Sequence, residues 1–202
     1  MNKIISDTEK SQNIILIVPD EKYQETIKGV LKELTSAKKT VCFVSVNKTK
    51  KAIEKELKDN GINLENIYFI DCVSKSISKG KISWSDEKTQ YIDNPKALTQ
   101  ISLAIFQLFD KTKIDFLLLD SVNTLLIYNN ENDVLKFVHH TTGKLKEAGK
   151  TGIFAYLKEG VNEKLMKKLS QFSDKIIEAD PPKKKEFVKK KGSMTGFEEI
   201  KL

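Results

Sequence analysis

The sequence contains no arginine, since all 35 of its basic residues are lysines. The planar guanidinium group of arginine forms two parallel hydrogen bonds to a carboxylate or phosphate. Any role that needs this geometry must be absent here or performed less well by a lysine. Cysteine is almost as scarce, and Cys42 and Cys72 form no metal-binding motif. Each of them lies in or beside an apolar run, so we expect two buried free thiols and no disulfide.

Long apolar runs are also missing. None approaches the roughly 20 residues needed to cross a bilayer, and residues 1–12, MNKIISDTEKSQ, contain no sustained apolar segment of the kind found in signal peptides. We therefore expect a cytoplasmic protein with no membrane contact. Its 202 residues suit one domain, or one domain with an appendage.

Apolar runs alternate with amphipathic segments along the chain. The runs predict strands at 13–18, 40–46, 66–71, 114–120, 151–157 and 174–179. The amphipathic segments predict helices at 21–37, 48–60, from Pro95 onward, at 131–148, and across Val161, Leu165 and Leu169. Nearly continuous apolar strands separated by helices indicate an α/β fold, in which a mainly parallel sheet is covered by helices on both faces.

The predicted domain spans residues 13–182, after an N-terminal extension at 1–12. A polar excursion at 72–94 interrupts the alternation, and it contains Trp84, the only tryptophan. Trp84 either anchors this loop to the domain or forms an exposed hot spot for a protein partner. With Lys79, Lys81 and Tyr91 nearby, a stacking platform for single-stranded nucleic acid is a further alternative.

The C-terminal segment 183–202 is basic, with seven lysines and three glutamates, a net charge of +4. Its alternating residues around Gly192 and Gly196 predict an antiparallel β-hairpin. Lys189 and Lys191 would then share one face and form a basic stripe that suits an acidic protein partner. Nucleic acid is expected to bind this stripe weakly, without sequence preference and only at low salt.

The run FLLLDSVNTLL at 116–126 resembles the Walker B strand of RecA-like and KaiC-like ATPases. The segments GKTGIFAY and SDKIIEAD resemble the next two strands of that family, and VKKKGSMTGFEEIKL resembles its closing hairpin. Archaeal KaiC-like proteins are the branch that the chain resembles most. The resemblance implies a three-layer sandwich and a nucleotide site that would use Thr26, Asp120 and Ser121, with Asp120 holding Mg²⁺ through water.

The segment that should bind phosphate departs from this family. Where the Walker A motif reads G-x-x-x-x-G-K-[ST], this chain has Pro19, Gln24, Glu25 and Thr26, of which only Thr26 fits. Pro19 lacks an N–H donor, and Glu25 puts a carboxylate where a lysine should attract the triphosphate. The position of the family's catalytic glutamate is Asn47. A basic finger would fall on Lys189 or Lys191. ATP and Mg²⁺ are therefore not expected as cofactors.

These departures predict a non-catalytic RecA/KaiC-like domain that binds or regulates a protein, either an active relative or a second copy of itself. Two alternatives stay open, a nucleic-acid-binding recombination accessory and a nucleotide-binding switch with a different phosphate site. Asp120 is then expected to be a structural acid that accepts hydrogen bonds from backbone amides.

The strand-end residues permit other arrangements as well. Asp20, Asp71 and Asp120 could converge on a cation, and Asp20, Asp71, Ser121 and Lys158 loosely imitate a receiver domain. His139 and His140 are adjacent on a helix and point about 100° apart, so they are not expected to share one metal, and we expect one at the surface and one partly packed.

Overall fold

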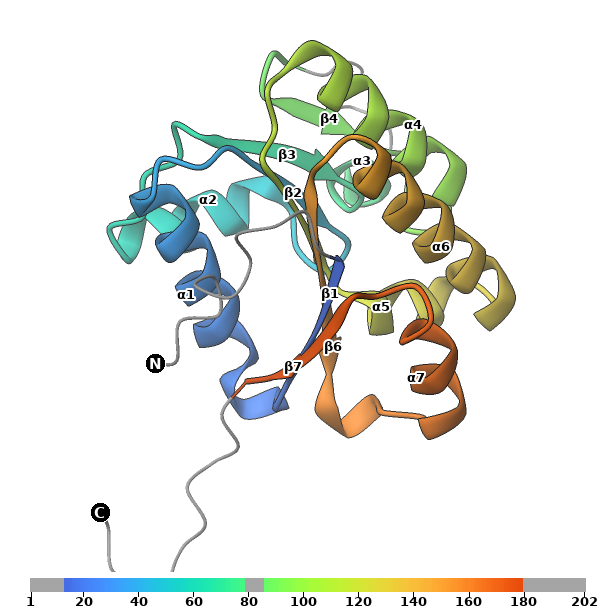
Figure 1. Cartoon of the computed structure of the whole chain (residues 1–202). Coiled ribbons are helices and arrows are strands. Elements are labelled where there is room, and N and C mark those ends of the chain that lie inside the picture. The colour runs from blue at the N-terminus through green and yellow to red at the C-terminus, as the bar shows by residue number, and fades with distance from the viewer. Residues whose placement is uncertain (1–12, 79–85, 180–202) are drawn as a thin grey trace, which may run out of the picture.

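The structure is a computed structural model that describes residues 13–78 and 86–179 (Figure 1). Its centre is one sheet of seven parallel strands in the order β4-β3-β2-β5-β6-β1-β7. The strands are β1 (Asn13–Val18), β2 (Val41–Ser45), β3 (Ile67–Asp71), β4 (Thr89–Tyr91), β5 (Phe116–Asp120), β6 (Thr151–Leu157) and β7 (Lys175–Glu178).

Helices cover both faces of the sheet, which makes three layers (Figure 1). α1 (Tyr23–Ser36) and α2 (Lys50–Asp59) lie on one face. The helices that contribute to the other face are α4 (Leu98–Lys111), α5 (Val122–Tyr128), α6 (Glu131–Glu147) and α7 (Glu163–Leu169). The remaining helical segments are α3 (Ser74–Ile77) and two 3-10 turns, Asp20–Lys22 and Lys158–Gly160. No helix in the described part of the chain combines the length and hydropathy needed to cross a membrane.

Strand β1 shows why the apolar runs fold in this way. Successive side chains of a strand point to opposite faces, so Ile15 and Ile17 pack under α4–α7 while Leu16 and Val18 pack under α1 and α2. All six residues of β1 are buried. Full burial of one such side chain stabilises the fold by about 1.5–3 kcal/mol, which explains why this strand carries no polar alternation.

The predicted α/β fold with a parallel sheet is confirmed. All six predicted strands are present, and β1 is flanked by β6 and β7, so it does not lie on an edge. The helix expected from Pro95 begins instead at Leu98, because Asn94 forms a turn in which its side chain accepts the Lys96 N–H at 2.9 Å. The predicted C-terminal hairpin at 183–202 and the extension at 1–12 lie outside the described residues.

The described parts of the excursion at 72–94 contain a helix and a strand that the sequence did not predict. It contains α3 just after β3, and it returns as β4, which pairs with β3 in parallel. β4 has only three residues, Thr89–Tyr91, and two of them are polar. So short a strand has no detectable apolar alternation, which is why it was interpreted as part of a loop.

Candidate functional site

The carboxyl ends of the parallel strands gather polar side chains at one edge of the sheet, where α/β proteins commonly bind ligands. Asp120 lies at the end of β5 and is only 5% exposed. Its Oδ1 accepts one hydrogen bond from the Tyr23 hydroxyl and another from the Asn47 side-chain amide, at 3.1 Å. Both donors are side chains, so the expectation that backbone amides hold this carboxylate was wrong.

Tyr23 comes to Asp120 from the first residue of α1. The helical period that buries Ile27 and Val30 also places Tyr23 against the core, where it is buried. The ring therefore packs as an apolar group while its hydroxyl reaches the end of β5. The helical period accounts for the buried ring, but it carries no information on the partner of the hydroxyl.

Asn47 connects Asp120 to helix α5. Its amide nitrogen donates to Asp120, while its amide oxygen accepts a hydrogen bond from the Thr124 hydroxyl. Ser121 is the N-cap of α5, and its side chain accepts the Thr124 N–H at 3.4 Å. Ser121 therefore caps helix α5. Asn47 is held between Asp120 and Thr124.

The pKa values of Asp120 and Tyr23 reflect the burial of this cluster. Burial raises the pKa of the Asp120 carboxyl, although the hydrogen bonds from Tyr23 and Asn47 lower it in part. Burial, followed by the charge of Asp120, also raises the pKa of the Tyr23 hydroxyl. The phenol therefore keeps its proton at neutral pH and stays a donor to Asp120.

Three backbone N–H groups of the turn between β1 and α1 are engaged within the protein. Pro19 has no N–H, the Asp20 N–H donates to Glu159 Oε2 at 3.0 Å, and the Lys22 N–H donates to the Pro19 carbonyl at 3.0 Å. The Tyr23 N–H donates to the Asp20 carbonyl. This segment is wound into a 3-10 turn that runs directly into α1, and none of these three N–H groups points free toward a ligand.

Acidic residues surround the same turn. Asp20 and Glu21 lie in the 3-10 turn, and Glu25 lies in the first turn of α1. Contact with Glu159 raises the pKa of Asp20, which is the response of a carboxyl group beside another carboxyl group. The positive end of a helix dipole normally attracts anions, but here it faces carboxylates of this chain.

Lys48 follows Asn47 and also takes part in side-chain contacts. Its ammonium group donates to Gln24 Oε1 at 2.9 Å and to Glu56 Oε1 at 2.6 Å. Gln24 lies on α1 and Glu56 on α2, so the lysine joins these two helices. Its charge is already paired with a carboxylate of this chain.

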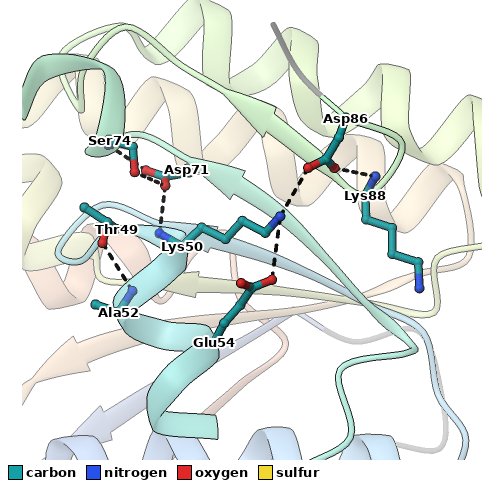
Figure 2. A network of polar contacts seen from close by, with 8 residues as sticks. All are labelled: Thr49, Lys50, Ala52, Glu54, Asp71, Ser74, Asp86 and Lys88. Atoms are coloured by element: carbon teal, nitrogen blue, oxygen red, sulfur yellow. Dashed lines mark hydrogen bonds and ion pairs between the residues drawn. The ribbon is translucent and has the colours of Figure 1, made fainter. Parts of the chain in front are cut away.

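Asp71 lies at the end of β3 (Figure 2), and it is held differently from Asp120. It is fully buried, and it accepts the Lys50 N–H at 2.7 Å and both the Val73 and Ser74 N–H groups at 2.8 Å. The Ser74 hydroxyl donates a fourth hydrogen bond. Asp71 therefore fixes the first turn of α2 and the start of α3 to the same strand end.

The side chain of Lys50 extends from this point toward β4 (Figure 2). Its ammonium group lies 3.2 Å from Asp86 Oδ2 and 3.6 Å from Glu54 Oε1. Asp86 in turn accepts the Lys88 N–H at 2.9 Å. These contacts attach the segment that leads into β4 to helix α2.

The sequence-predicted site residues do not form one centre. Thr26 is half-buried on α1, and it is Tyr23 on the same helix that contacts Asp120. In the described ranges no three His, Cys, Asp or Glu side chains form a group that could hold a metal ion, and Asp71 and Asp120 have separate partners. Trp84, Lys189 and Lys191 lie outside the described residues.

Other residues singled out from the sequence are structural or lie elsewhere. Cys42 and Cys72 are free and buried, as predicted. Lys158 pairs with Glu178 at 3.1 Å. His139 and His140 are both exposed, yet each packs against an aromatic ring, so the expectation of one surface and one partly packed histidine holds only in part. His139 stacks on Phe172, and His140 meets the Phe106 ring edge-on.

Comparison with known proteins supports the fold. A KaiC-like protein from the hyperthermophilic archaeon Pyrococcus horikoshii has a TM-score of 0.62 and 14% identity, covering 94% of this chain and 84% of the other. The flagellar accessory protein FlaH from Methanocaldococcus jannaschii has a TM-score of 0.55 and 14% identity, covering 91% and 75%. No curated protein matches the sequence. The family of unknown function DUF7504 matches residues 15–179, and this RecA-like α/β chain belongs to that family.

Proposed function

We propose that this protein is a non-catalytic RecA/KaiC-like domain that acts by binding or regulating another protein and does not hydrolyse nucleoside triphosphates. In this proposal the window from Pro19 to Thr26 is a Walker A segment that has lost its phosphate cradle. The chain is then a member of the archaeal KaiC-like branch, and its partner is an active relative or a second copy of itself.

The observation that carries the proposal is that Asp120 is buried and already accepts hydrogen bonds from two side chains of this chain. A Walker B carboxylate must be accessible to the water shell of Mg²⁺, but this one is buried and accepts hydrogen bonds from Tyr23 and Asn47. Binding of the ion through Oδ1 would require those two side chains to leave, and a buried donor without a partner costs about 1–3 kcal/mol.

The turn before α1 supports the same conclusion. Phosphate binding at a helix N-terminus uses free backbone N–H groups and a favourable dipole. The Asp20, Lys22 and Tyr23 N–H groups are engaged within the protein. The carboxylates of Glu21 and Glu25 stand beside them and repel a triphosphate. Phosphoryl transfer consists mostly of positioning and charge stabilisation, and both are weak here.

The test is a calorimetric titration of the purified protein with Mg·ATP and Mg·GTP, together with a phosphate-release assay. We expect no turnover above the buffer rate and no binding at nucleotide concentrations up to about 1 mM, which corresponds to less than about 4 kcal/mol of binding free energy. Turnover or tighter binding that is lost in Asp120→Ala would overturn the proposal.

A matched variant sharpens this test. Gln24→Gly combined with Glu25→Lys restores two of the Walker A residues without changing Pro19, Tyr23 or Asn47. Because the N–H groups of the turn stay engaged, we expect this variant to bind Mg·ATP weakly if at all and to stay inactive. A gain of turnover would mean that the turn can open. It would also mean that the native Gln24 and Glu25 alone are responsible for the absence of activity.

A further inference from the structure

Helices α4 and α6 lie side by side on the same face of the sheet (Figure 1), and a groove of about 780 Å³ runs between them. Its apolar surface comes from Leu98, Leu103 and Phe106 of α4 and from Phe137 of α6. The Leu103 side chain is 55% exposed. This groove lies outside the Asp120 cluster and has no part in the site described above.

The apolar surface of α4 is wider than the sheet can cover. Ile101, Ile105 and Leu108 are buried against the sheet. Leu103 and Phe106 are three residues apart and therefore lie on a neighbouring stripe of the same helix, which faces the groove. A helix packed on one layer only would be expected to carry polar residues on this stripe.

Two contacts join the elements that line the groove. The Asn129 side chain, just before α6, donates to the Pro95 carbonyl, just before α4, at 3.2 Å. Phe106 of α4 meets His140 of α6 edge-on, with the ring centroids 5.5 Å apart. From Leu98 to Phe106 the wall is about 12 Å long at 1.5 Å per residue, which is the length of about two turns of a bound helix.

The charged side chains on the rim of the groove indicate the charge of the partner that would bind there. Lys96 and Lys136 both line the groove and are exposed, and neither forms an ion pair within the described part of the chain. The one carboxylate in the lining, Asp133, accepts a hydrogen bond from the Asn130 amide at 2.7 Å. Two unpaired ammonium groups beside an apolar floor complement a partner with carboxylates flanking its apolar residues.

We propose that the α4–α6 groove binds an amphipathic helix of a protein partner, whose apolar residues contact Leu103 and Phe106 and whose flanking carboxylates pair with Lys96 and Lys136. A helix fits better than an extended segment, because the groove walls are helices whose backbone groups are internally bonded and could not pair with a strand. The basic segment 183–202 is excluded as the occupant by its net charge of +4, which Lys96 and Lys136 repel.

This inference rests on the protein-binding part of the proposed function, and it does not depend on the state of the nucleotide site. The test is a selection from a phage-displayed library of helical peptides in which one face is randomised, with the full chain as the target. The enriched peptides are then synthesised with a fluorescent label, and their binding is measured by anisotropy at two salt concentrations. We expect enrichment of apolar residues at i, i+4 and i+7 flanked by Glu or Asp.

Two variants of the groove and two matched controls decide where the peptides bind. Leu103→Ser and Lys136→Glu are each expected to weaken binding at least about tenfold, and Lys136→Glu should also remove most of the salt dependence. Ile127→Ser changes an apolar side chain that is 78% exposed and outside the groove. Lys51→Glu changes an exposed lysine of α2 on the opposite face of the sheet. Both controls should bind like the wild type.

The inference is overturned if no peptide is enriched, if enriched peptides bind Leu103→Ser as tightly as the wild type, or if they show no preference for acidic flanks. It is also overturned if sedimentation shows that the chain dimerises through this groove, with the dimer lost in Leu103→Ser. If the protein hydrolyses ATP and still binds these peptides, the proposal that it is non-catalytic is wrong, but the assignment of the groove as a peptide site is unaffected.

Discussion

Two buried aspartates lie at the ends of strands of the same sheet, and their carboxylates accept hydrogen bonds from different kinds of donor. Asp71, at the end of β3, accepts three backbone N–H groups and one hydroxyl. Asp120, at the end of β5, accepts only side-chain donors, from Tyr23 and Asn47. Asp71 therefore fixes backbone turns, whereas Asp120 depends on the identity of two other residues.

The difference shows where function can be lost without loss of the fold. Any residues at positions 50 and 73 except proline would supply the same N–H donors to Asp71. The environment of Asp120 depends on a tyrosine and an asparagine, so one or two substitutions would expose this carboxylate. At Asp120 the proposed loss of catalysis therefore resides in side chains, on a backbone that matches the RecA-like fold.

The largest expected effect comes from Asp71→Ala. The substitution leaves the N–H groups of Lys50, Val73 and Ser74 without their acceptor in a buried site, and we expect the free energy of unfolding to fall by about 3 kcal/mol. Urea denaturation measures it, with Asp71→Asn as the control that keeps one acceptor oxygen and should lose less. A loss below about 1 kcal/mol would mean that these turns do not depend on the carboxylate.

A smaller effect is expected for Tyr23→Phe, which keeps the buried ring and removes the hydroxyl. Asp120 then keeps only the hydrogen bond from Asn47, and the free energy of unfolding should fall by about 1–2 kcal/mol. Since the lost hydrogen bond favours the charged carboxylate, the pKa of Asp120 should rise further. Urea denaturation and an NMR titration of the carboxyl carbon measure the two changes. An unchanged pKa would contradict the contact.

The smallest effect at neutral pH is expected for Asp120→Asn, because the amide oxygen can accept both existing hydrogen bonds. We expect a change of about 1 kcal/mol or less at pH 7. Burial raises the pKa of Asp120 in the folded state, so the folded protein binds this proton more tightly than the unfolded chain does. As pH rises from the unfolded pKa to the folded pKa, the wild type loses stability, and above that window the loss is complete.

The asparagine variant has no such titration. The stability of the wild type relative to Asp120→Asn should therefore increase as the pH is lowered from 7 to about 4. Denaturation curves of both proteins across this range provide the measurement, and the other carboxyl groups cancel in the difference. The opposite slope would show that the carboxylate is stabilised as an anion, as expected for a site prepared for a cation.

The apolar runs made the interior of the fold predictable. NIILIV and TGIFAYL gave β1 and β6 with the bounds that the structure has, because a strand buried on both faces leaves a continuous apolar run. Helix α5 was missed, since VNTLLIY follows β5 directly and its apolar residues were interpreted as a continuation of the Walker B pattern. Strand β4 was missed because three mostly polar residues carry no periodicity.

The candidate site was less predictable for a physical reason. The sequence predicted that phosphate-binding residues are missing at Pro19, Gln24 and Glu25, since those positions are defined by spacing. It did not show what replaces them. The bond from Tyr23 to Asp120 joins residues 97 positions apart, and Asn47 was noted only as the absence of a glutamate. Long-range partners of polar side chains depend on the packing of whole helices, which local patterns do not encode.

The lengths of the edge strands affect how this protein behaves at high concentration. In the described sheet the two edges are β4, with three residues, and β7, with four, whereas the interior strands β1 and β6 have six and seven. An incoming strand would find few N–H and C=O groups to pair with, and β7 carries the charged residues Lys175 and Glu178. Short, charged edges oppose edge-to-edge aggregation. Contacts between copies of the described domain are then left to its helical faces.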